Sequence, residues 1–343
     1  MADVTVRGAG IFGLSIAWAC QQRGASVIVV DPFGVGAGSS GGVVGALAPH
    51  TPENWNPKKA FQLDSLLSAG PFWAAVEADT GLKTGYGRTG RLQSIADSHA
   101  LDLARAREAS AKDLWQGKAT WAVIGDNQKW APVSATGHLI HDTLSARIHP
   151  SRACAALAAA IQVGGGKLLP EAPDLGTVVW ATGAQGLDDL SKELGKNIGG
   201  PQKGQAALLR PAVEVSSDAP QILVDAVHVV PHYDGTVAIG STSEGTFDNP
   251  TSTDRLLDSL IARAITAVPA LAGAQVIARW AGLRPRTRSR APILGKHPTR
   301  PGHFIANGGF KIGFGMAPKI ADVMTDLILE GKDLIPDDFR IES

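Results

Sequence analysis

The stretch VTVRGAGIFGLSIAWACQQRGASVIVVD, residues 4–31, decides the fold. Its β-branched start predicts a strand, its apolar middle predicts a helix from about Ile11 to Arg23, and VIVVD predicts a second strand. Three glycines in the spacing G-x-G-x-x-G join the first strand to the helix: Gly8, Gly10 and Gly13. Strand, glycine turn, helix and strand in this order predict a Rossmann-like βαβ unit, the start of a parallel sheet.

The same unit predicts a dinucleotide site. Without Cβ atoms, the first two glycines allow a tight turn and the close approach of a pyrophosphate, and the third allows the helix to pack on the strand. Asp31 ends the second strand, where a carboxylate can accept from both ribose hydroxyls. An acid there favours FAD or NAD over NADP, and a glycine-rich turn without a ligand is the alternative. The expected contacts are Gly8, Gly10, Ile11, Phe12, Gly13, Asp31 and Pro32.

The bulk composition excludes several other classes of protein. The chain has 343 residues, enough for two domains, and Lys plus Arg equals Asp plus Glu at 32 each. No overall basic charge therefore indicates nucleic acid or an anionic membrane. No apolar run is long enough for a membrane span, and no cleavable signal opens the chain. Cys20 and Cys154 lie far apart without a Cys/His cluster, so we expect no disulfide, no metal and a cytoplasmic protein.

The next segment, GVGAGSSGGVVGALAPH at 34–50, distinguishes FAD from NAD. It resembles the second flavin-contacting segment of the D-amino-acid oxidase, glycine oxidase and sarcosine oxidase family, in which a Ser/Thr pair binds phosphates and the following run passes along the isoalloxazine ring. A flexible Gly/Ser loop is the alternative. The resemblance implies phosphate contacts from Ser39 and Ser40, ring contacts from Val44, Gly45, Ala46 and Leu47, and a place near the substrate for His50.

Further segments resemble the same family, in the family's order. They are GRTGRLQSIAD (87–97), RIHPSRACAALAAAI (147–161), TVVWATGAQG (177–186), HVVPHYDGTVAIGSTSEG (228–245), WAGLRP (280–285) and NGGFKIGFGMAP (307–318). The resemblance is greatest to glycine oxidase-like members and implies FAD, bound non-covalently because no cysteine lies near the flavin segments. It also implies that Ala181, Thr182 and Gly183 close over the adenosine side. Segment 167–176 is shorter than the three-stranded meander that the family usually has there, and the resemblance names no residue in it as the adenine contact.

The last of these segments resembles the flavin loop of the family, with a helix that we expect to start near Met316. Gly309 and Lys311 replace the usual His and Arg of that loop. Lys311 could place a positive charge near the reduced flavin, and a solvated loop lysine is the alternative. The resemblance implies flavin contacts from Gly308, Gly309, Phe310, Lys311, Ile312, Gly313, Phe314 and Gly315.

Four arginines occupy every second position near the end of WAGLRPRTRSR. By the family match, Arg284 grips the substrate carboxylate with its planar fork, and a structural Arg paired with a protein carboxylate is the alternative. Arg286, Arg288 and Arg290 form either a solvated loop or a positive cavity mouth that attracts acidic substrates. His228 stands where the family has a tyrosine and could bond the same carboxylate. A structural role is the alternative for both His50 and His228.

The predicted fold class is α/β: a Rossmann-like FAD-binding domain (1–52, 138–200 and 280–343) interleaved with an α+β substrate domain on an antiparallel sheet (53–137 and 201–279). The predicted reaction is FAD-dependent oxidation of glycine, a D-amino acid or an N-alkyl glycine. Hydride passes from Cα to flavin N5, and the imine gives a keto acid plus ammonia or amine. Oxygen, a quinone or another carrier would accept the electrons, and the chain could form a homo-oligomer. The alternatives are oxidative demodification of a carboxymethyl-modified tRNA base and a non-catalytic flavin-binding subunit.

Overall fold

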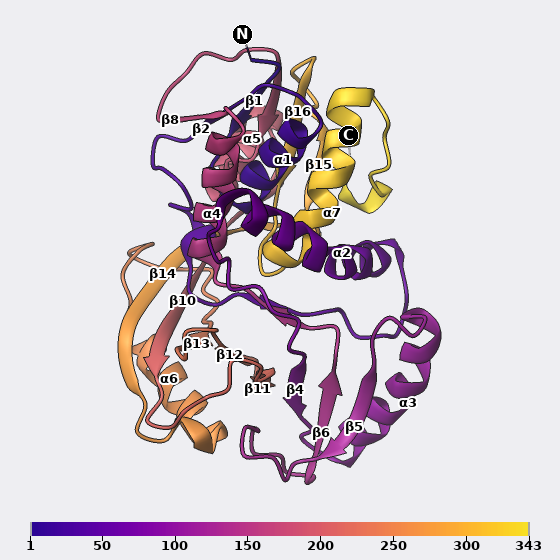
Figure 1. Ribbon diagram of the computed structural model, residues 1–343, viewed down its shortest axis with the longest axis vertical. Coiled ribbons are helices and arrows are strands. Elements are labelled where there is room, and N and C mark those ends of the chain that lie inside the picture. The colour runs from indigo at the N-terminus through magenta and orange to yellow at the C-terminus, as the bar shows by residue number, and fades with distance from the viewer. Residues whose placement is uncertain (1, 342–343) are drawn as a thin grey trace.

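The computed structural model describes residues 2–341. Its strands form two large sheets at opposite ends of the molecule, one of six strands and one of eight (Figure 1). A two-stranded ribbon pairs β3 (Ala46–Leu47) with β7 (Ala146–Arg147). The α/β class with a second, largely antiparallel sheet is therefore confirmed.

The six-stranded sheet contains the predicted βαβ unit. Its order across the sheet is β15 (Ile293–Lys296), β16 (His303–Asn307), β9 (Thr177–Trp180), β1 (Val4–Arg7), β2 (Val27–Val30) and β8 (Lys167–Leu169). All neighbours are parallel except β15 and β16. The central strand is β1, and its apolar residues are buried on both faces, as a parallel sheet requires.

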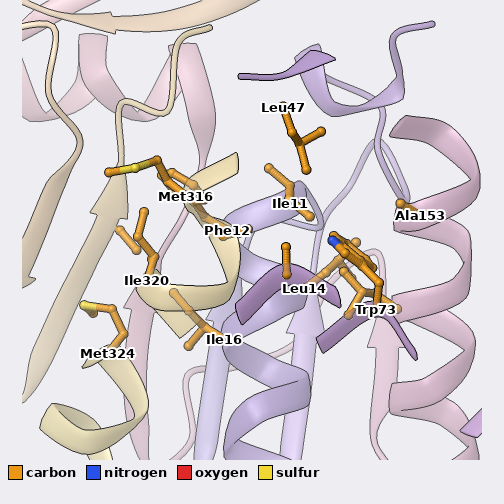
Figure 2. Close-up of a cluster of buried hydrophobic side chains, with 14 of the residues drawn as sticks. Ile11, Phe12, Leu14, Ile16, Leu47, Trp73, Ala153, Met316, Ile320 and Met324 are labelled. Atoms are coloured by element: carbon orange, nitrogen blue, oxygen red, sulfur yellow. The ribbon is translucent and has the colours of Figure 1, made fainter. Parts of the chain in front are cut away.

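Helices cover this sheet and form the larger core with it. They are α1 (Ile11–Gln22), α2 (Pro57–Thr80), α4 (Pro150–Val163), α5 (Gly183–Leu194) and α7 (Gly313–Thr325), followed by a π-helical turn at Asp326–Glu330 and a 3₁₀ turn at Asp337–Phe339. Figure 2 shows Leu14 and Ile16 of α1 among Trp73 of α2, Ala153 of α4 and Met316 of α7. The core thus joins helices from distant parts of the chain.

Two glycines of the first turn are required by backbone packing. Gly8 has φ +111°, and a Cβ on it would lie 2.3 Å from the carbonyl oxygen of Ala181. A Cβ on Gly13 would lie 1.9 Å from the carbonyl oxygen of Gly8. Glycine therefore allows β1, β9 and α1 to approach one another, as the sequence predicts for helix–strand packing.

The eight-stranded sheet lies at the other end. Its order is β14 (Gln275–Thr287), β10 (Gly199–Arg210), β13 (Val237–Gly240), β12 (Val227–Pro231), β11 (Gln221–Val224), β4 (Arg91–Ser94), β6 (His138–Asp142) and β5 (Trp121–Gly125). Only β11 and β4 pair in parallel. Helix α6 (Arg255–Ala267), with a 3₁₀ turn at Pro269–Leu271, packs on one face through an apolar cluster, and α3 (Ser98–Leu114) packs against β5.

The predicted division into two domains remains a proposal, and two elements differ from it. Strand β6 pairs with β4 and β5 in the eight-stranded sheet, although the proposed FAD domain contains its residues. Helix α2 packs against α7 and α4, although the proposed substrate domain contains it. In both cases contacts with distant segments decide to which part of the molecule the element belongs. The sequence of the element itself does not indicate these contacts.

Two local predictions need correction or refinement. Helix α7 begins at Gly313, ahead of the predicted start near Met316, because two glycines weaken the helical pattern of its first turn. Segment 167–176 contributes the edge strand β8 and then a loop, tied to β1 by the hydroxyl of Thr5, which donates to the Leu175 carbonyl at 2.7 Å.

We predict that Gly13→Ala lowers the thermal unfolding midpoint by about 3 °C or more, because the new methyl group forces α1 away from β1. Differential scanning fluorimetry of the purified protein measures the midpoint. Gly125→Ala is the matched control, since a Cβ there meets only the side-chain oxygen of Asn127 at 3.8 Å. Equal midpoints for the two variants would contradict the packing role of Gly13.

Candidate active site

The carboxyl ends of β1 and β2 meet at the N-terminus of α1. There the Asp31 carboxylate accepts from the backbone N–H of Ala9 at 2.8 Å and from that of Phe33 at 2.9 Å. Within residues 2–341, no hydrogen-bond partner is found for the backbone N–H groups of Gly10, Phe12 and Gly13. Unpaired N–H groups at a helix N-terminus beside an acid-ended strand suit a pyrophosphate and a ribose. These residues therefore fit a bound dinucleotide.

The predicted serine pair lies beside this helix end. Ser39 and Ser40 start a 3₁₀ turn, Ser39–Gly41. The buried hydroxyl of Ser40 accepts from the backbone N–H of Ile11 at 3.0 Å, so the turn adjoins the N-terminus of α1. The structure thus brings Ser40 to the place where the sequence predicts a phosphate contact.

The third predicted cofactor segment, residues 181–183, follows the end of β9, the strand beside β1. Ala181 follows β9, and Thr182 precedes the first turn of α5. Gly183 has φ +62°, and its carbonyl accepts from the side-chain amide of Asn307 at 2.9 Å. Ala181 and Gly8 are in backbone contact, so this turn and the glycine turn lie at the same edge of the sheet.

The residues predicted to contact the flavin ring, 44–47, lie between the two sheets. A Cβ on Gly45 would be 1.9 Å from the Ile148 carbonyl oxygen, next to the pairing of β3 with β7. On the other side, a Cβ on Gly240 would be 2.9 Å from the Cγ2 atom of Val44. We call residues 42–47 the junction segment, because it contacts elements of both ends of the molecule.

One face of the eight-stranded sheet turns toward the junction segment. Residues paired across neighbouring antiparallel strands share a face. One row of such pairs runs through Leu223, His228, Gly240, Ala206 and Trp280. Gly240 adjoins Val44, and the Trp280 ring lies 3.4 Å from where a Cβ of Gly42 would be. The opposite face packs on α6, so His228 lies on the face directed at the predicted flavin segment.

Arg284 lies on that same face, because side chains along β14 alternate and Trp280 and Arg284 are an even number of residues apart. Its guanidinium lies over β10, where a Cβ on Gly204 would be 1.9 Å away. It donates to the Ser241 hydroxyl at 2.5 Å and to the Thr242 carbonyl at 3.2 Å. Only 8% of the residue is exposed.

This buried cation has no carboxylate of its own. Among the described residues, Arg284 takes part in no ion pair. Burial lowers the pKa of the guanidinium to about 10, against the opposing charge of Glu244. An unpaired buried charge costs roughly several kcal/mol of folding free energy. The arrangement is therefore typical of a site that receives an anion.

The predicted flavin loop is fastened to β14 next to Arg284. The backbone N–H of Phe310 donates to the Pro285 carbonyl at 3.2 Å, and Phe310 has a left-handed φ of 42°. A Cβ on Gly309 would be 2.9 Å from the Phe12 ring, so the loop also contacts α1. The structure therefore brings the flavin loop, α1 and Arg284 together.

The remaining residues of that loop run into α7. Ile312 directly precedes the helix, and Gly313, Phe314 and Gly315 form its first turn. Among the described residues, no hydrogen-bond partner is found for the backbone N–H groups of these three. Such a helix end favours negative charge nearby.

The two histidines of the predicted site differ in their surroundings. Burial lowers the pKa of His228 to about 4, and the charges of Arg91, Lys311 and Arg284 lower it further. His228 is therefore neutral at pH 7 and lies within the electrostatic reach of Arg284. The ring and backbone N–H of His50 both contact the side-chain oxygen of Gln62 on α2, and no interaction found in residues 2–341 joins His50 to Arg284.

Sequence reasoning missed two buried arginines. Arg91 is paired with the buried Asp142 at 3.0 Å and adds positive charge near His228. Arg147, beside the junction segment in β7, is 5% exposed and donates to the Pro231 carbonyl at 3.1 Å. Nothing in their local sequence distinguishes them from surface arginines, because their burial follows from strand pairing across the sheet.

The chain resembles known proteins along nearly its whole length. A model of the DAO family, described as FAD dependent oxidoreductase, matches residues 3–327. The glycine oxidase of Pseudomonas putida is 28% identical over 97% of this chain and 96% of that protein. The glycine oxidase structure from Geobacillus kaustophilus has a TM-score of 0.86 at 21% identity, covering 99% of this chain and 98% of that one.

A second solved structure has the same fold. The iminodiacetate oxidase of Chelativorans has a TM-score of 0.85 at 21% identity and covers 98% of each chain.

In residues 2–341, no helix is both long and apolar enough to cross a membrane.

His232 gives the site region a pH dependence. Its Nε2–H donates to the carbonyl of Val43 at 3.0 Å, so its buried Nδ1, for which no partner is found among the described residues, carries no proton. Burial lowers the pKa of His232 to about 4, and the adjacent His149 ring lowers it further. The unfolded chain, with a pKa of about 6.5, binds the proton more tightly. Stability from this group is therefore complete above about pH 6.5 and falls as the pH drops toward 4.

We expect wild type to lose about 2 kcal/mol more unfolding free energy between pH 7 and pH 5 than His232→Gln does. Urea unfolding at the two pH values measures the difference. His99→Gln, which changes an exposed histidine on α3, serves as control and should follow wild type. If the unfolding free energy of His232→Gln depends on pH as that of wild type does, the buried ring is not the group that titrates.

Proposed function

The chain belongs to the DAO family of FAD-dependent oxidoreductases and is glycine oxidase-like, and from this we propose that it oxidises a small amino acid or N-alkyl glycine at the carbon that bears nitrogen. The product is an imine, which water converts to a keto acid and ammonia or an amine. The observation that carries this proposal is Arg284. Its buried guanidinium has no carboxylate partner among the described residues, and it lies on the sheet face that is turned toward the junction segment.

Several parts of the chain would hold the cofactor. The N-terminus of α1, Asp31 and Ser40 would take the dinucleotide end, and the junction segment and the loop from Gly308 to Ile312 would take the ring end. When bound, FAD supplies a hydride acceptor at flavin N5. The relatives named above are glycine oxidases and an iminodiacetate oxidase, which supports amine oxidation by this chain.

Arg284 would orient the substrate. A planar fork that donates two N–H groups to the two oxygens of a carboxylate fixes direction as well as charge. The bonds to Ser241 and Thr242 hold the guanidinium in one position before substrate arrives. Such preorganisation reduces the entropy lost on binding and positions the reacting C–H bond.

His228 and the first turn of α7 would complete the site. Because the pKa of His228 is about 4, its part is a hydrogen bond from a neutral ring and not a charge. The backbone N–H groups of Gly313, Phe314 and Gly315, at the start of this helix, would stabilise negative charge that develops on the ring end. The chain itself thus binds, orients and stabilises, and proton transfer by a side chain is not required.

We predict that anaerobic addition of glycine, sarcosine, D-proline or D-alanine bleaches the flavin band near roughly 450 nm, a property of flavins in general. Arg284→Gln should lower the rate at limiting substrate by about 100-fold or more, because a buried charge-assisted carboxylate contact is lost. Stopped-flow absorbance measures the rate.

Arg279→Gln is the matched control, since Arg279 lies on the same strand but is exposed and paired with Asp258 at 2.6 Å. It should retain the wild-type rate. If no amine tested, including the dicarboxylic amines used below, bleaches a fully flavin-loaded protein, the proposed function is wrong.

A further inference from the structure

We propose, resting on the function above, that the substrate is a dicarboxylic amine. Arg284 binds the carboxylate next to the reacting carbon, and Arg286 together with Lys311 binds the second. Candidate substrates of this class are D-aspartate, D-glutamate and N-carboxymethyl glycine.

Strand pairing gathers these three cations in one place. Arg284 and Arg286 are two residues apart on β14 and therefore share the face that looks toward the junction segment. The hydrogen bond from the Phe310 N–H to the Pro285 carbonyl, between the two arginines, brings the flavin loop to the same point. The guanidinium of Arg286 then lies 5.9 Å from the centre of the Phe310 ring, and the amine of Lys311 lies 5.5 Å from it.

The three cations have no protein counter-charge. Within the described part of the chain, none of Arg284, Arg286 and Lys311 forms an ion pair. Arg286 has a neutral partner, the side-chain oxygen of Gln202, at 3.2 Å. A single substrate carboxylate would neutralise one of the three charges and leave two.

Buried cations elsewhere on this sheet are paired. Lys203, on β10, lies 3.6 Å from the carboxylate of Glu244 and 3.7 Å from that of Asp254. Arg91, on β4, lies 3.0 Å from Asp142. These two buried cations thus have carboxylate partners, whereas no ion pair is found for Arg284 or Arg286 among the described residues.

The cations also repel one another. Partial burial lowers the pKa of Lys311 most, and the positive charges of Arg284, Arg286 and Arg290 lower it further. A second anionic group between Arg286 and Lys311 would relieve this repulsion. Lys311 is exposed too, but its neighbour Phe310 is bonded to β14, whereas the exposed Arg288 and Arg290 follow the end of that strand.

The first test measures binding without turnover. Isothermal calorimetry on the flavin-loaded protein, at constant ionic strength, compares malonate, succinate and glutarate with propionate, butyrate and pentanoate. We expect the best dicarboxylate to bind about 10-fold or more tightly than the monocarboxylate of equal length. Arg286→Gln and Lys311→Gln should abolish this preference, and Lys311→Arg should retain it.

Arg288→Gln is the matched control. It removes the same charge from the next outward position of the same run, and it should keep the full preference. Equal affinities for both classes of acid in wild type would overturn the proposal. Equal losses in Arg288→Gln and Lys311→Gln would overturn it too, because the effect would then be the general field of the arginine run.

The second test separates this proposal from the proposed function. Anaerobic flavin reduction is compared for D-aspartate, D-glutamate and N-carboxymethyl glycine against glycine and sarcosine. Reduction without a dicarboxylate preference overturns the inference and leaves amine oxidation standing. A dicarboxylate preference in calorimetry, without reduction by any amine, supports the second anion site and contradicts amine oxidation. If Lys311→Gln slows all substrates equally and leaves malonate binding unchanged, Lys311 serves the flavin and the inference is wrong.

Discussion

The site depends on the antiparallel pairing of β10 with β14. This ribbon runs from the pair Arg210 and Gln275 to the pair Gly199 and Thr287, and both of its strands contact α5, which belongs to the end of the molecule with the six-stranded sheet (Figure 1). Its register places the glycine at 204 beneath the guanidinium of Arg284. The carbonyl of Pro285, on the same strand, holds the flavin loop. One set of backbone hydrogen bonds therefore fixes the distance between Arg284 and the predicted flavin loop.

Charge in this site is arranged before any ligand binds. Folding buries Arg284, and among the described residues its hydrogen-bond partners are a hydroxyl and a carbonyl. This placement costs free energy that the rest of the fold offsets, and it is recovered when an anion arrives. His228, being neutral, adds a polar contact without adding to the repulsion. The region is thus electropositive, which is the property that the proposed carboxylate site requires.

The parts that the sequence could predict are local or carried by a long motif. The glycine turn, the helix after it and the acid at position 31 follow from residues that are close together along the chain, and all are present. Arg284 was identified from WAGLRP alone, but its lack of a carboxylate partner depends on every strand that packs around it. Arg91 and Arg147 were missed for the same reason. The places of β6 and α2 likewise follow from pairing and packing between distant segments, which no local pattern encodes.

The order in which the core is assembled has a consequence for synthesis on the ribosome. The central strand β1 pairs with β9, and the apolar face of α1 packs against α7 near the other end of the chain. The first segments to emerge must therefore keep an apolar surface uncovered until most of the chain has been translated. Such long-range closure slows folding and lengthens the time during which nascent chains can associate. We therefore expect a chaperone that shields apolar surface to raise the yield of folded protein until the residues of α7 have been translated.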